Sequence, residues 1–193
     1  MARIVLMPRW GGDDTSDWYP WLRERMPEAD LIIATLLPEP GAPVIDDCIT
    51  ELRRIVGVDP SRLVETLLVG HSVGCQAMIR FLATLPDAVA VKGLVCIAGW
   101  FWVDEPWPTL MPWQAEPIDD PRIRAAAPDL RVLLSDDDPF TSDHMKNADT
   151  WRTRLDAQVT IHPGRRHYNE PEEPLVLEAI EQALHPIVPP TVG

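Results

Sequence analysis

A serine between two glycines is the strongest chemical signal in this chain. The segment Gly70-His71-Ser72-Val73-Gly74 follows a short apolar run and opens a longer amphipathic one. A serine in a sharp strand-to-helix turn needs small flanking residues, because neighbouring backbone passes close to it. Such a turn would present the hydroxyl of Ser72 as a nucleophile, whereas His71 is expected only to pack. A glycine turn that matches the pattern by chance is the alternative interpretation.

A serine hydroxyl becomes a strong nucleophile only when a base, usually a histidine oriented by a carboxylate, removes its proton. In strand-turn-helix sites of this kind the acid and then the histidine follow the serine along the chain, each in a loop after a later strand. His167 lies in the loop after the last predicted strand, and His162 stands at the end of that strand. We therefore expect His167 to be the base.

The acid is expected from an aspartate run after the fifth predicted strand. Asp136, Asp137 and Asp138 stand there in succession before Pro139. We expect Asp138 to orient His167, since the residue before the proline lies furthest into the loop, and Asp137 is the reserve candidate. A solvated turn or a helix cap is the alternative. The run lacks the spacing and the glycine of a calcium loop, so we predict no metal site.

Two backbone amides are candidates for stabilising the oxyanion that forms when a serine attacks a carbonyl group. The amide of Val73 stands at the positive end of the helix that follows the serine. The amide of Trp10 is the second candidate, because Gly11 and Gly12 let the loop after the first strand turn toward the serine. A glycine turn without a chemical role is the alternative for this loop.

The elements that must position these residues follow an alternation of short apolar runs and longer amphipathic segments, typical of parallel strands joined by helices. Strands are predicted at residues 4–7, 31–36, 66–69, 94–98, 132–134 and 159–161. Most are continuously apolar, as strands covered on both faces should be. Helices are predicted from a cap at Ser16 through Met26, over 45–56 and 73–85, near 145–155 and over 177–184. The predicted fold class is therefore α/β, with a six-stranded, mostly parallel sheet and helices on both faces.

The one long interval without periodicity, residues 99–128, is rich in aromatic residues. It contains Trp100, Phe101, Trp102, Trp107 and Trp113. An insertion at this point of an α/β fold usually overhangs the active site, so these side chains could wall an apolar acyl or aromatic pocket. Ordinary core packing is the alternative.

The net charge of −13 over 193 residues disfavours nucleic acid and membrane surfaces as partners, because both require clusters of Lys and Arg. A small-molecule acyl substrate fits better, and the chemistry requires no cofactor. No apolar run is long enough to span a bilayer or to form a signal peptide, so we expect a cytoplasmic protein.

Cys48, Cys75 and Cys96 stand in apolar settings, which predicts buried thiols. The length favours one domain over residues 1–193 and leaves the oligomeric state open.

Taken together, these motifs resemble the small serine hydrolases related to retinoblastoma-binding protein nine and the bacterial YdeN-like proteins, a compact branch of the α/β hydrolases. The resemblance covers nearly the whole chain and rests on residues 8–11, 18–22, 70–74, 135–140 and 164–169. It implies a carboxylesterase-like enzyme with Ser72, Asp138 and His167 as its triad. It does not support binding to the retinoblastoma protein, because the incomplete LxCxE counterpart at 94–98 lacks the glutamate.

Two positions depart from the pattern of those relatives. Arg9 stands where they have glycine beside the oxyanion loop, and Arg165-Arg166 precedes His167 where a single glycine is common. The leading hypothesis is hydrolysis of an ester, thioester or activated amide through an acyl-enzyme on Ser72. The alternative is a hydrolase-fold binding protein with a vestigial triad that acts through its tryptophan-rich segment, and Arg9 is the feature that favours it.

Overall fold

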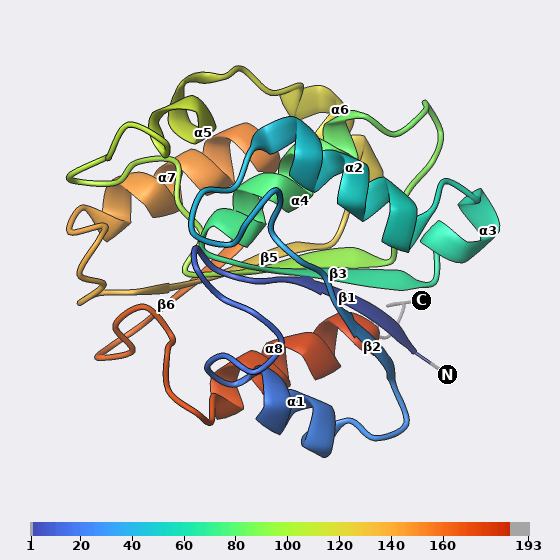
Figure 1. Cartoon of the computed structure of the whole chain (residues 1–193), viewed down its shortest axis with the longest axis horizontal. Helices are drawn as coiled ribbons and strands as arrows, with labels where there is room; N and C mark the ends of the chain where they lie inside the picture. Colours follow the sequence, from blue (N-terminus) through green and yellow to red (C-terminus); the bar gives the residue numbers. More distant parts are fainter. Residues whose placement is uncertain (1, 186–193) are drawn as a thin grey trace, which may run out of the picture.

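Parallel strands form one central sheet in the computed structural model, which describes residues 2–185. Within those residues the sheet has six strands in the order β2-β1-β3-β4-β5-β6, and every neighbouring pair is parallel (Figure 1). The strands are β1 (Arg3–Met7), β2 (Asp30–Ile33), β3 (Thr66–His71), β4 (Gly93–Ile97), β5 (Leu130–Ser135) and β6 (Gln158–His162). Because all strands run the same way, the loops after them gather at one edge of the sheet.

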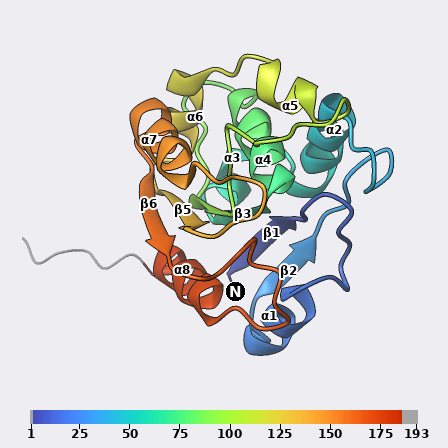
Figure 2. The same ribbon diagram turned by 90° about the vertical axis from the view of Figure 1, so that its left-hand side faces the viewer.

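Helices cover both faces of this sheet, as Figures 1 and 2 show. One face carries α1 (Tyr19–Arg25) and α8 (Pro174–Leu184). The other carries α2 (Ile45–Val56), α3 (Pro60–Leu63), α4 (Val73–Ala83), α5 (Met111–Ala115), α6 (Asp120–Ala126) and α7 (His144–Leu155). The prediction of an α/β fold with both faces covered is confirmed, and the sheet is wholly parallel.

Each strand feeds two separate cores, because successive side chains point to opposite faces. In β1, Val5 and Met7 pack under α2 and α4, whereas Ile4 and Leu6 pack against α1 and α8. All four side chains are fully buried. This double burial explains why the strand sequences are continuously apolar instead of alternating.

Several predicted boundaries are wrong by a few residues. The second strand ends at Ile33 and not at residue 36, because the chain leaves β1 there and Leu36 turns into the core beneath α2. The first helix begins at Tyr19 with Trp18 at its N-cap, and Ser16 instead bonds within the preceding turn. The helix after the serine ends at Ala83 and not at residue 85. The helix over 45–56 was predicted at its observed bounds.

The aromatic interval after β4 holds two short helices, α5 and α6, which lie on the same side of the sheet as α4 (Figure 2). Cys48, Cys75 and Cys96 are free and buried, as expected. Within residues 2–185, no helix is long and apolar enough to cross a membrane. The prediction of a single domain over 1–193 includes residues outside the described ones and stays a prediction.

Candidate active site

The turn between β3 and α4 holds Ser72 in a strained conformation. Its φ is +56°, a left-handed value that non-glycine residues rarely adopt. A Cβ at Gly70 would lie 2.6 Å from the Cα of Cys75, and one at Gly74 would lie 2.1 Å from the carbonyl oxygen of Met7. The two glycines are therefore required by the close approach of backbone on either side of the serine, as predicted for a nucleophile turn.

His167 lies in the loop between β6 and α8, and its ring is oriented by an aspartate in the loop that follows β5. Its Nδ1 lies 2.8 Å from Oδ2 of Asp138, and both residues are buried. The other carboxylate oxygen of Asp138 accepts a bond of 2.9 Å from the backbone N–H of Phe140. With Nδ1 engaged by a carboxylate, Nε2 is the ring nitrogen of His167 left for Ser72 or a substrate.

The three aspartates of the acidic run have different contacts. Asp136 accepts from the N–H of Gly164 at 2.9 Å, and Asp137 accepts from the N–H of Arg166 at 2.7 Å. The hydroxyl of Ser135 also donates to Asp137, and these bonds lower the pKa of that carboxyl group. Both side chains are exposed and brace the backbone of the histidine loop, while only Asp138 reaches the ring of His167.

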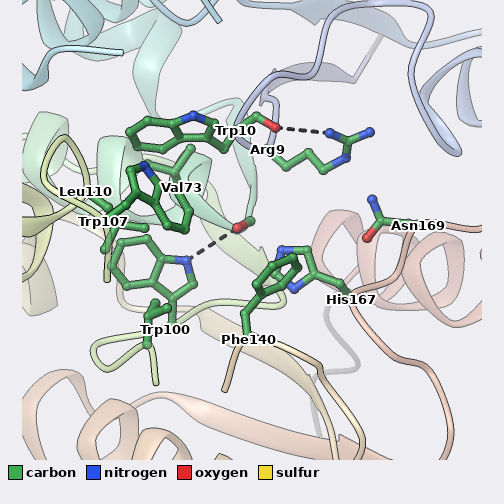
Figure 3. A pocket seen from close by; sticks show the side chains of 11 residues that line it. Arg9, Trp10, Val73, Trp100, Trp107, Leu110, Phe140, His167 and Asn169 are labelled. Carbon is green, nitrogen blue, oxygen red and sulfur yellow. Dashed lines mark hydrogen bonds between the residues drawn. The ribbon is translucent and has the colours of Figure 1, made fainter. Parts of the chain in front are cut away.

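A cavity of about 130 Å³ lies over Ser72 and His167. Its lining combines residues from five segments of the chain: Arg9, Trp10, Ser72, Val73, Trp100, Val103, Trp107, Leu110, Phe140, His167 and Asn169 (Figure 3). The indole Nε1 of Trp100 donates to Oγ of Ser72 at 3.3 Å. The ring of Phe140 stands edge-on to that of His167, with centroids 4.8 Å apart. The candidate nucleophile and base thus share one small cavity with three tryptophans and a phenylalanine.

Trp10 and Val73, the two candidate oxyanion donors, both line this cavity. Among the hydrogen bonds within residues 2–185, neither backbone N–H donates to a protein acceptor. The guanidinium of Arg9 donates to the carbonyl oxygen of Trp10 at 3.0 Å and makes two bonds to Asp17, at 2.7 and 3.1 Å. The arginine that departs from the family pattern therefore pairs with a carboxylate and with the carbonyl of the Trp10–Gly11 peptide.

His71 is part of a buried hydrogen-bond chain that the sequence did not predict. Its Nε2 lies 2.8 Å from the carbonyl oxygen of His167, and its Nδ1 lies 2.8 Å from the hydroxyl of Tyr19. A carbonyl can only accept, so Nε2 must carry the proton and Nδ1 must accept from Tyr19. The Tyr19 oxygen in turn accepts from the N–H of Arg9 at 3.1 Å. These hydrogen bonds link the loop after β1 to the loop between β6 and α8, which carries His167.

Burial keeps His71 neutral. Complete removal from solvent, together with the neighbouring His167 and Arg9, lowers the pKa of His71 well below its usual value. The carboxylate of Asp17, 4.0 Å from Nδ1, is already paired with Arg9. The two hydrogen bonds of His71 require a neutral imidazole, with one ring nitrogen donating and the other accepting.

The Arg165-Arg166 departure has a local explanation. Arg165 forms an ion pair with Glu173, which is fully buried, and its N–H donates to Ser135 Oγ at 2.9 Å. Burial raises the pKa of Glu173, and the arginine opposes that rise. The arginine side chain is thus used to anchor the histidine loop to the start of α8. Glu173 is a supporting residue that no sequence pattern had indicated.

The aromatic interval divides between the cavity and the core. Trp100 and Trp107 line the cavity, whereas Phe101 and Trp113 pack in the core. Trp102 is 48% exposed, with Nζ of Lys146 4.1 Å above its ring. Core packing therefore holds for Phe101 and Trp113, and the role of Trp100 and Trp107 as walls of an acyl pocket stays a prediction.

The described residues offer no group of three or more His, Cys, Asp or Glu side chains arranged to hold a metal ion. The groups able to do chemistry in the cavity are a hydroxyl, an imidazole paired with a carboxylate, and two unengaged amides. This combination suits nucleophilic attack on a carbonyl carbon.

Comparison with known proteins gives a consistent result. A family model described as "Serine hydrolase" matches residues 4–185. The YdeN protein of Bacillus subtilis (strain 168) is 31% identical over 100 residues, and the matched segment spans 50% of this chain and 50% of that relative. The chain therefore matches only about half the length of this curated relative.

Solved structures resemble the chain over nearly its whole length. The crystal structure of the ydeN gene product from B. subtilis has a TM-score of 0.81 at 22% identity, covering 95% of this chain and 98% of that one. Est1E from Butyrivibrio proteoclasticus, with ferulic acid bound, has a TM-score of 0.70 at 11% identity, covering 94% and 87%. At these identities the structural matches establish the fold alone.

Proposed function

The chain belongs to the serine hydrolase family, and we propose that it hydrolyses a small ester, thioester or activated amide through an acyl-enzyme on Ser72. Its fold is that of the α/β hydrolases. The observation that carries the proposal is the buried pair of His167 and Asp138, 2.8 Å apart, at the wall of the cavity that also contains Ser72.

In the proposed first half-reaction, Nε2 of His167 takes the proton of the Ser72 hydroxyl while Oγ attacks the carbonyl carbon. Asp138 holds the ring with its proton on Nδ1 and stabilises the imidazolium that forms. The tetrahedral intermediate collapses when His167 gives its proton to the leaving alcohol, thiol or amine. Water then repeats the sequence on the acyl-enzyme and releases the acid, which regenerates the serine.

Charge on the intermediate requires donors that are free before the reaction begins. The N–H groups of Val73 and Trp10 are the proposed oxyanion donors, because both residues line the cavity and neither amide is engaged. Losing one such donor typically costs about 3–4 kcal/mol of barrier lowering. The peptide that carries the Trp10 N–H is held in place, because its carbonyl oxygen, that of Arg9, accepts from the N–H of Gly12 at 2.9 Å.

Trp100 is proposed to orient the nucleophile. Its indole N–H occupies one lone pair of Ser72 Oγ. The hydroxyl proton is then available to the base, because an indole can only donate.

Intact-mass labelling with diisopropyl fluorophosphate, a small organophosphate, tests the proposal. We expect one adduct on the wild type and none on Ser72→Ala or His167→Ala. The exposed Ser142→Ala and His185→Ala are matched controls and should label like the wild type. A folded wild-type protein that takes no label would overturn the proposal and favour the binding-protein hypothesis.

A further inference from the structure

The cavity over Ser72 has two chemically different sides. The tryptophans and Leu110 gather on one side, opposite the polar groups, whereas the ring of Phe140 stands beside His167 (Figure 3). The apolar side consists of Trp10, Trp100, Trp107 and Leu110, and the polar side of Arg9, His167 and Asn169. A leaving group must lie near the proton on His167, so the acyl group of a substrate lies toward the tryptophans.

The apolar side is built from packed rings and opens to solvent at its partly exposed residues, Trp10 and Trp107. Trp10 and Trp107 meet edge to face with centroids 5.0 Å apart, and Trp10 is held by a bond of 2.9 Å from its Nε1 to the carbonyl of Gly41. Trp100 and Leu110 are each only 2% exposed. Trp100 and Leu110 are close-packed and resist displacement, so they form the fixed part of the wall.

The volume fixes how large a group this wall admits. The whole cavity measures about 130 Å³. A cavity of about 150 Å³ lined by apolar side chains accommodates one benzene ring. The space over Ser72 therefore holds an acyl group of about four to six carbon atoms, and a longer acyl chain would extend beyond the apolar wall.

We propose that the substrates are esters or thioesters of short apolar acids with about four to six carbons, and that Trp107 and Leu110 set the upper limit on acyl length. This inference rests on the proposed acyl-enzyme at Ser72. The inference adds the size of the acyl group and the residues that select it.

A series of p-nitrophenyl esters with acyl chains of two, four, six, eight and ten carbons tests the acyl limit. We expect kcat/KM to rise by about fourfold per added methylene while the chain fits the cavity, since each buried methylene contributes about 0.8 kcal/mol. Beyond six carbons kcat/KM should fall by at least tenfold. A kcat/KM that keeps rising to ten carbons, or that is flat across the series, overturns the inference.

Two tryptophans of the same segment supply a matched pair of variants. Trp107→Ala should move the optimum to eight or ten carbons, whereas Trp102→Ala, whose ring faces outward, should leave it unchanged. Leu110→Ala is the second test if Trp107→Ala does not fold. An optimum unchanged in each folded cavity variant, or one moved equally by Trp102→Ala, overturns the assignment of these residues.

Labelling by diisopropyl fluorophosphate separates the two proposals. A labelled enzyme with no preference for short acyl groups leaves the acyl-enzyme on Ser72 standing and refutes the acyl limit. A folded enzyme that neither labels nor turns over any ester refutes both.

Discussion

Replacing His71 with glutamine should change how stability depends on pH. The imidazole is fully buried between Tyr19 and the carbonyl of His167, and its pKa is well below the usual value because of burial, His167 and Arg9. In the unfolded chain the same group takes a proton near pH 6.5. As pH falls below that value, protonation therefore favours the unfolded state, and folded stability is lost.

The magnitude follows from proton linkage. While the unfolded chain binds one more proton than the folded one, the free energy of unfolding falls by about 1.4 kcal/mol per pH unit. Glutamine does not titrate, so His71→Gln should remove up to that slope between about pH 6 and the folded pKa. At pH 8 the variant should still be less stable by about 1–3 kcal/mol, because Tyr19 loses its acceptor.

Urea unfolding at intervals from pH 8 to pH 5 measures both quantities. Tyr19→Phe is the matched control, since it removes the same hydrogen bond and keeps the titrating ring. It should lower stability at every pH and retain the slope of the wild type. The low pKa of His162, which burial and then Arg165 cause, contributes equally to all three proteins. Equal pH slopes for wild type and His71→Gln would refute the assignment of a neutral, buried imidazole.

Three further outcomes are expected at the site. Trp100→Phe should lower kcat/KM about 2- to 10-fold at unchanged stoichiometry of labelling, because the serine loses one neutral hydrogen bond of about 0.5–1.5 kcal/mol. Asp138→Asn should lower kcat by about 10²–10⁴. Asp137→Asn should lower it less than about tenfold in steady-state assays, because Asp137 bonds to the Arg166 N–H and the Ser135 hydroxyl and does not reach His167. Gly74→Ala should reduce the yield of folded protein or lower its midpoint of thermal unfolding by more than 10 °C, because its Cβ would overlap the carbonyl of Met7. Wild-type behaviour of any of these variants would contradict the corresponding contact.

The sequence predicted the sheet well because its signals are local. Continuous apolar runs mark strands buried on both faces, and the observed strands include or overlap every predicted one. The errors occur where tertiary contacts decide the outcome. Leu36 is apolar and follows a strand, yet it leaves the sheet to pack under α2. Ser16 is a good capping residue, but the turn through Asp13 engages it before the helix begins.

The candidate site was predictable in part for the same reason. Chain order and turn chemistry indicated Ser72, Asp138 and His167, whose catalytic roles stay predictions. The buried chain through His71 and the ion pair of Arg165 with Glu173 join residues far apart in sequence or hidden in a loop, and no spacing rule reports such pairs. The contacts of His71 depend on how loops from different strands meet at one edge of the sheet, and the Arg165–Glu173 pair depends on how the loop between β6 and α8 folds back on itself.

The left-handed backbone at Ser72 lowers the stability of the fold in exchange for the position of the hydroxyl. Glycine adopts that conformation without strain, whereas any other residue there costs about 1–3 kcal/mol. Ser72→Gly would thus yield a more robust fold that has lost its hydroxyl. Laboratory evolution that selects for thermal tolerance without also selecting for turnover would steadily enrich such inert descendants.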